Sequence, residues 1–158
     1  MIRHARESDF AGIMALYAEL HPEDPALADG SDRQVFDQIL AAEGLHLLVL
    51  EGEDQRLDAS CYLNVIPNIT RAAAPYAIIE NVITRKARRN TGLGKAMIGH
   101  ALNVAWSAGC YKVMLQTGSR RESTHRFYRS CGFRDDDKFA FVARPPSGAG
   151  RRPGDSPR

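Results

Sequence analysis

The order of apolar and polar residues predicts a chain that mixes strands and helices from its start. Residues 2–5 alternate as a short strand does, and Ser8 can cap a helix whose apolar residues recur at helical spacing over 10–17. Two prolines break the following stretch, and Ser31 can cap a second helix that extends to Leu40. The chain is therefore expected to open as strand, helix, helix.

The middle of the chain has the pattern of three strands. Residues 45–50 are apolar apart from His46, and the polar turn at 51–55 leads into a second strand-like segment at 57–66. This arrangement is typical of a β-hairpin. Residues 76–84 are rich in β-branched side chains and too short for a typical helix, so they predict a central strand.

The last third of the chain returns to alternating helices and strands. A helix with a wide apolar face follows Gly92 and ends near Gly109. A strand at 111–117, a short helix at 123–130 and a closing strand at 139–143 complete the pattern. The predicted order β-α-α-β-β-β-α-β-α-β indicates an α/β fold with a mixed, partly parallel central sheet flanked by helices.

The size of the chain fits one globular domain. Its 158 residues are 44% hydrophobic, and we assign residues 1–144 to a single domain. No apolar stretch approaches the roughly 20 residues that cross a bilayer, so no membrane association is expected. The charged N-terminus lacks the apolar core of a secretory signal, which predicts a cytoplasmic protein.

The formal net charge of +2 has its source in the last residues of the chain. Residues 145–158 hold three arginines and one aspartate, so the remaining body is neutral. This segment has no large apolar residue, and we expect a disordered basic tail. The neutral body argues against nucleic-acid binding through the tail and the basic residues at 85–89.

The cysteines do not suggest a bridge or a metal site. Cys61, Cys110 and Cys131 are odd in number and far apart, without the paired spacing of zinc ligands. We therefore expect free thiols and no bound metal.

A glycine-containing turn between the predicted strand at 76–84 and the long helix carries the clearest chemical signal. Its residues are Arg89, Asn90, Thr91, Gly92, Leu93 and Gly94. A helix N-terminus offers unpaired amides and the positive end of the helix dipole, and glycines let a phosphate approach. The spacing fits neither the Rossmann nor the Walker pattern. The context nevertheless predicts a pyrophosphate site.

Two motifs resemble the GNAT superfamily of N-acetyltransferases. Arg89-x-x-Gly92-x-Gly94 is similar to its Gln/Arg-x-x-Gly-x-Gly/Ala signature, and residues 127–133 resemble the tyrosine and Gly-Phe ending of its later helix. With the element order, the resemblance covers about residues 1–142. It implies acetyl-CoA as cosubstrate, no metal, and as acceptor a small-molecule amine or a protein amino group.

The resemblance also implies roles for individual residues. The pantetheine and acyl carbonyl would be bound by Val82, Ile83 and Thr84. The pyrophosphate would be held by Arg89, Asn90, Thr91, Gly92, Leu93, Gly94 and Lys95. Tyr128 falls at the position of the general acid, which protonates the coenzyme A thiolate after the amine attacks the thioester directly. Asn90 departs from the pattern, because glycine is frequent at its position.

The attacking amine must lose a proton, and Glu80 is the best candidate to take it. Strand alternation would place Glu80 on the same face as Val82 and Thr84, beside the acyl group. A water chain could serve instead, and Glu80 could equally pair with an arginine. His125, three residues before Tyr128, is a weaker candidate.

Two functions from different classes remain open on the sequence. The first is an acyl-CoA-dependent N-acetyltransferase acting through a ternary complex. The alternative is a non-catalytic acyl-CoA-binding sensor or regulatory module. A homodimer is compatible with both.

Overall fold

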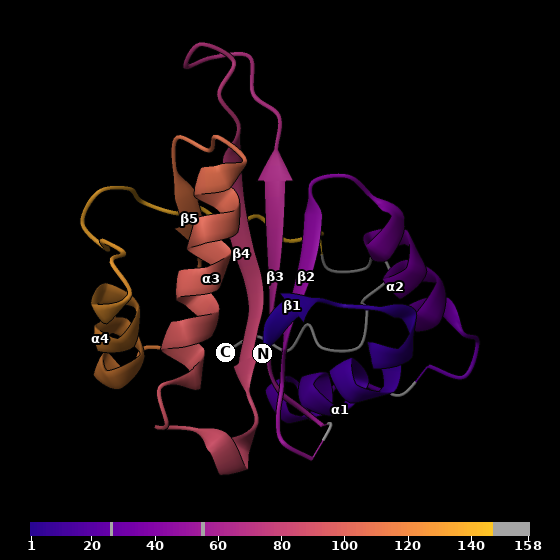
Figure 1. The fold of residues 1–158 in the computed structure, drawn as a ribbon. Coiled ribbons are helices and arrows are strands. Elements are labelled where there is room, and N and C mark those ends of the chain that lie inside the picture. Colours follow the sequence, from indigo (N-terminus) through magenta and orange to yellow (C-terminus); the bar gives the residue numbers. More distant parts are fainter. Residues whose placement is uncertain (26, 55, 147–158) are drawn as a thin grey trace.

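The protein is built around a five-stranded sheet. The structure is a computed structural model, and it describes residues 1–25, 27–54 and 56–146. The strands follow one another in the order β1-β2-β3-β4-β5, with β4 and β5 parallel and the other neighbours antiparallel (Figure 1). The predicted mixed, partly parallel sheet is confirmed.

The elements agree with the predicted order as far as the last helix. The strands are β1 (Ile2–His4), β2 (Leu45–Glu51), β3 (Leu57–Ile66), β4 (Tyr76–Thr84) and β5 (Val113–Leu115). The helices are α1 (Phe10–Leu20), α2 (Ser31–Ala41), α3 (Leu93–Ser107) and α4 (Glu122–Ser130), with the 3-10 turns η1 (Glu7–Asp9) and η2 (Lys86–Arg88). Ser8 lies inside η1 rather than capping α1, so that helix begins later than the pattern predicted.

Each face of the sheet has its own core. Figure 1 shows α3 in front of the sheet with α4 beyond it, and α1 and α2 on the other flank. The α3 core contains Cys61 and Leu63 of β3, whereas the half-buried Tyr62 between them packs against the α1 core. Alternate residues of β3 thus serve opposite cores, as strand geometry requires.

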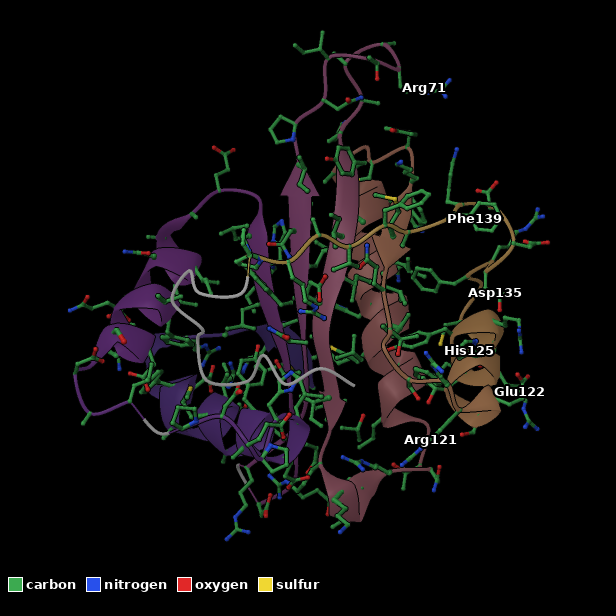
Figure 2. The ribbon with its side chains drawn as sticks, turned by 180° about the vertical axis from the view of Figure 1, so that it is seen from behind. Arg71, Arg121, Glu122, His125, Asp135 and Phe139 are labelled. Carbon is green, nitrogen blue, oxygen red and sulfur yellow. The ribbon has the colours of Figure 1, made fainter. Side chains whose placement is uncertain are left out.

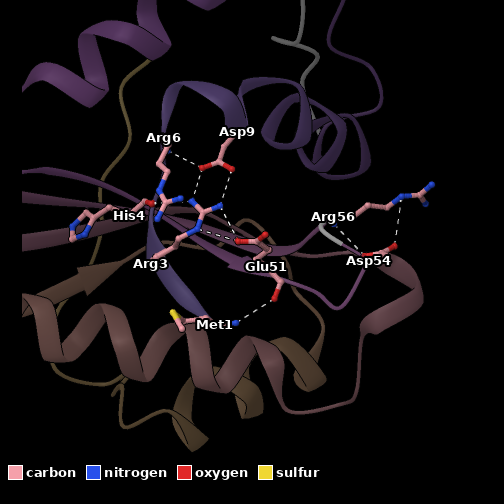
Figure 3. A network of polar contacts seen from close by, with 8 residues as sticks. All are labelled: Met1, Arg3, His4, Arg6, Asp9, Glu51, Asp54 and Arg56. Atoms are coloured by element: carbon pink, nitrogen blue, oxygen red, sulfur yellow. Dashed lines mark hydrogen bonds and ion pairs between the residues drawn. The ribbon is translucent and has the colours of Figure 1, made fainter.

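Polar contacts fasten the first strand to its surroundings (Figure 3). The guanidinium of Arg3 donates to both oxygens of Asp9 (2.6 and 3.0 Å) and to Glu51 (3.1 Å). The hydrogen bonds from Arg3 lower the pKa of the Asp9 carboxyl, although burial opposes them. This network joins β1, η1 and the end of β2.

The closing strand expected at 139–143 is wrong. These residues form no strand, and the side chains of Phe139 and Phe141 are 90% and 95% exposed. The segment crosses the sheet on the face opposite to α3 instead of joining it (Figure 2). The alternation of apolar and polar residues describes side chains, but a strand also needs a backbone partner. The neighbouring strand β5 has only three residues with which to pair. The segment at 134–138, which leads to residues 139–143, is charged throughout.

The expected disordered tail falls mostly outside the described residues. Residues 145 and 146 have no regular structure, and 147–158 lie beyond the part that the structure describes. Within that part, no helix combines the length and apolar character that a membrane span requires.

Candidate active site

The strands β4 and β5 are paired over only three residues. Their register runs from Ala77 opposite Val113 to Ile79 opposite Leu115. β4 continues to Thr84, but β5 ends at Leu115, so the following residues of β4 have no strand beside them on that edge in the described part of the chain. Backbone N–H and C=O groups along this edge are available to a ligand, apart from the Thr84 carbonyl, which accepts a hydrogen bond from Arg89.

A bulge interrupts β4 where the two strands part. Tyr62 lies opposite Glu80, but Ser60 lies opposite Ile83, so β4 carries one extra residue in this interval. Asn81 has a φ of 50°, in the left-handed region that asparagine tolerates better than most residues. Such a bulge reverses the alternation of the side chains beyond it.

The bulge corrects the expectation that Glu80 shares a face with Val82 and Thr84. Before it, Ile79 faces the α3 core and Glu80 the α1 side; after it, Val82 packs against the α3 core and Ile83 lies in the α1 core. Glu80 is exposed on the α1 face of the sheet. Glu80 therefore lies on the opposite side of β4 from Val82 and Thr84, and of the expected acyl-binding residues only Ile83 shares its side.

The turn before α3 has the geometry expected of an anion site. Asn90 and Gly92 adopt left-handed φ values of 60° and 86°. Ala96 N–H bonds to the Gly92 carbonyl at 3.0 Å, so the amides from Leu93 to Lys95 precede the hydrogen-bond ladder of the helix. Because asparagine can adopt this conformation, the departure from glycine at position 90 is compatible with the turn.

Gly94 also has a packing role that the sequence did not reveal. A Cβ at this position would lie 3.2 Å from Thr84 Oγ1 and 3.3 Å from the ring of Phe127. The glycine thus lets α3 approach the end of β4 and α4 together. The missing side chain therefore serves close packing, in addition to the phosphate approach that the sequence predicts.

Much of the basic segment before α3 is engaged by the protein itself. Arg85 and Arg88 lie 3.7 and 3.3 Å from the buried carboxylate of Asp58, and Arg89 donates to the Thr84 carbonyl at 3.1 Å. The role of Asp58 was not predicted, although a lone acid inside the strand-like segment 57–66 is a usable signal in the sequence. These contacts fix the path of the chain from β4 to the turn.

Tyr128 lies half-buried on the α3 side of the gap. Its ring makes edge contacts with Phe127 and Phe133, at centroid distances of 5.1 and 6.3 Å. Burial raises the pKa of the phenol, and the negative charge of Glu80 is among the smaller contributions in the same direction. The phenol is therefore protonated at neutral pH, and Tyr128 lies near enough to Glu80 to feel its charge across the gap.

His125 has a structural contact that weakens its candidacy as the base. Its Nε2 lies 2.7 Å from the carbonyl oxygen of Ser119. A carbonyl only accepts, so this nitrogen carries a proton and donates it. His125, which lies on α4 (Figure 2), thus holds the loop that leads from β5 to α4.

The thiols near the site are poorly suited to act as nucleophiles. Burial raises the pKa of Cys61 to about 12 and raises that of Cys131 as well. Little thiolate exists at neutral pH under these conditions. No group of side chains suited to hold a metal ion is found among the described residues.

Comparison with known proteins agrees with this geometry. The model of the acetyltransferase (GNAT) family matches residues 11–133. A glucosamine 6-phosphate N-acetyltransferase of Trypanosoma brucei brucei is 29% identical over 137 residues, covering 87% of this chain and 90% of the relative. Glucosamine 6-phosphate N-acetyltransferase 1 of Oryza sativa subsp. japonica is 32% identical, covering 77% of this chain and 73% of the relative.

A solved structure gives the same picture of the fold. A protein from Agrobacterium tumefaciens str. C58 superposes with a TM-score of 0.86 and 43% identity, over 92% of this chain and 99% of the other. The fold and the matches define the class of protein as an N-acetyltransferase. More particularly, the chain belongs to the acetyltransferase (GNAT) family, which uses acetyl-CoA.

Proposed function

We propose that the protein transfers the acetyl group of acetyl-CoA to a primary amine by direct attack within a ternary complex. The observation that carries this proposal is the gap beyond the pair Ile79–Leu115, with Tyr128 on one side and Glu80 on the other. In this proposal both groups act where the free edge of β4 receives the ligand. Acetyl-CoA supplies the activated thioester.

The chain offers groups for each part of the cosubstrate. The amides at the start of α3 and the glycine at position 92 favour the pyrophosphate, and the exposed Lys86 and Lys95 add positive charge. The backbone of Val82, Ile83 and Thr84 is suited to hydrogen bonds with the pantetheine and the acyl carbonyl. The turn and the free edge are joined directly, so one extended ligand can contact both.

The proposed proton transfers balance across the gap. Glu80 takes a proton from the ammonium form of the acceptor, which frees the lone pair for attack. The new nitrogen–carbon bond forms as the carbon–sulfur bond breaks, the nitrogen loses its second proton to water, and Tyr128 protonates the departing sulfur. Since both groups exchange their protons with water afterwards, the enzyme returns to its starting state with a net release of one proton.

An amino sugar phosphate is the acceptor class that we propose first. The two curated relatives described above are named for glucosamine 6-phosphate. A protein amino group remains the second candidate acceptor. The comparison of glucosamine 6-phosphate with glucosamine isolates the contribution of the phosphate.

A thiol-release assay with acetyl-CoA tests the proposal. The acceptors are glucosamine 6-phosphate, glucosamine, spermidine, an aminoglycoside and a lysine-containing peptide, with product mass measured for each. We expect thiol release together with an acetylated product for at least one amine. Coenzyme A binding without release for any amine would contradict the proposal and favour the non-catalytic sensor.

A further inference from the structure

A polar group of side chains lies on the α1 side of the β4 bulge. Ser60 of β3 is fully buried, and its Oγ has no hydrogen-bond partner among the residues that the structure describes. A buried hydroxyl without a partner is costly, so its presence in a core needs a reason. In register, Ser60 lies opposite Ile83, directly after the bulge.

Tyr17 of α1 brings a phenol to the same place. It is half-buried and packs against the α1 core. Burial raises its pKa to about 12, while the nearby side chains of Ser60 and Asn81 act in the opposite direction by favouring the phenolate. Tyr17 therefore stays neutral at physiological pH and offers one donor and an acceptor oxygen.

This polar group continues onto the exposed surface beside the expected base. Asn81 is exposed at the bulge and lies near Tyr17, and Glu80 immediately precedes it in β4, opposite Tyr62. Tyr128 lies on the other side, against the α3 core. An amine that delivers its proton to Glu80 thus arrives on the side where Tyr17 lies.

We propose that Tyr17, oriented by Ser60 and Asn81, binds the attacking amino group of the acceptor. The inference rests on the proposed function. When the amine is bound, the Tyr17 oxygen accepts a hydrogen bond from it, and the phenol hydrogen turns to Ser60 Oγ or Asn81 Oδ1; the Ser60 hydroxyl then gains the partner that it lacks among the described residues. A second amine hydrogen points to Glu80, and the lone pair that deprotonation frees is left for the thioester carbon. Ser60 and Asn81 are positioning residues, because they act through Tyr17.

Steady-state kinetics of four variants test this inference, with the fastest amine of the acceptor panel. Tyr17→Phe removes the phenol hydroxyl, and Ser60→Ala removes the buried serine hydroxyl. Asn81→Gly removes the side-chain amide, and glycine adopts the positive φ of this position without strain. Tyr111→Phe is the control, since it removes an exposed phenol at the far end of the sheet. We expect Tyr17→Phe to raise the amine KM about ten-fold, the size of one lost hydrogen bond, with the acetyl-CoA KM unchanged.

The same variants separate this role from a structural one. Ser60→Ala loses no hydrogen bond of the fold, so its Tm should not fall, yet its amine KM should rise several-fold. If Tyr17→Phe keeps the amine KM and kcat within two-fold of wild type, the inference is overturned while the proposed function stays intact. The same holds if the KM values for the amine and for acetyl-CoA change equally and the Tm falls. Wild-type protein that transfers to no amine would overturn both.

Discussion

At the scale of single residues, the two sides of the gap between β4 and β5 are chemically different. Glu80 is an exposed carboxylate on the α1 side, whereas Tyr128 is a half-buried phenol whose pKa is raised by burial. One group is suited to accept a proton and the other to donate one at neutral pH. Groups with separated proton affinities are the usual arrangement for acid and base roles.

Glu80→Gln should lower kcat about 100-fold near pH 7, because the amide cannot take the proton of the acceptor. The loss should shrink as the pH approaches that at which the amine is already neutral. Glu53→Gln is the matched control, since Glu53 is an exposed carboxylate in the β2–β3 turn. A pH–rate profile of all three proteins measures this, and a loss that is the same at every pH would exclude the role of base.

The backbone conformation of Asn90 explains why this position can depart from the glycine that is frequent in the family signature. Its φ of 60° is accessible to asparagine and glycine but costly for a β-branched residue. Asn90→Gly should keep the affinity for coenzyme A within about three-fold, whereas Asn90→Val should weaken it at least ten-fold through strain in the turn. Calorimetric titration with coenzyme A measures both, and equal affinities would show that the turn geometry does not matter for binding.

At the scale of elements, the sequence predicted the five strands of the sheet, together with a sixth at 139–143 that does not form, but not how the strands depart from regularity. Residues 76–84 were identified as a strand because their composition is strongly β-forming. The bulge at Asn81 was not predictable, since the segment reads as a strand whether or not one residue is extra. The position of Glu80 relative to Val82 therefore came out wrong, and no hydrophobic pattern could have corrected it.

The motif at the start of α3 was predictable in sequence and context, but its contacts were not. The turn and the helix lie where the pattern placed them. Asp58 is 27 residues from Arg85, and this pairing depends on how β3 and β4 pack. A local pattern cannot specify a partner that tertiary structure brings near.

The network around Arg3 is expected to stabilise the first strand and the turn after it. Asp9→Asn leaves the guanidinium without its closest carboxylate and should cost about 1–3 kcal/mol of unfolding free energy. Asp37→Asn is the control, because its pair with Arg33 is an exposed i,i+4 contact worth about 0.3–0.5 kcal/mol. Urea unfolding of both variants measures this, and equal losses would contradict the account.

The pH dependence of this network has a definite sign. The pKa of Asp9 is lowered in the folded protein, so the carboxylate contributes stability above the ordinary value of 3.8. This contribution is lost as the pH falls through the folded pKa. Asp9→Asn should therefore differ most from wild type at neutral pH and least in strong acid, as urea midpoints at pH 7 and pH 3 can determine.

At the scale of the whole molecule, the described fold extends from β1 to α4, and the site needs nothing beyond it. Residues 147–158 lie outside the described part, and none of them has a role in the proposed reaction. A protein ending at residue 146 should retain kcat and both KM values within two-fold, measured by thiol release. A larger loss would place the tail in substrate binding. Cytoplasmic location and a homodimer remain predictions, the second testable by sedimentation.

Tyr128 is proposed to protonate the sulfur released in acetyl transfer, and this step is central to the proposed function. The direct measurement is thiol release by Tyr128→Phe, with coenzyme A affinity determined on the same protein. The account predicts a kcat lowered about 100-fold or more and an affinity nearly unchanged, because the phenylalanine keeps the packing of the ring. Unchanged turnover would contradict it.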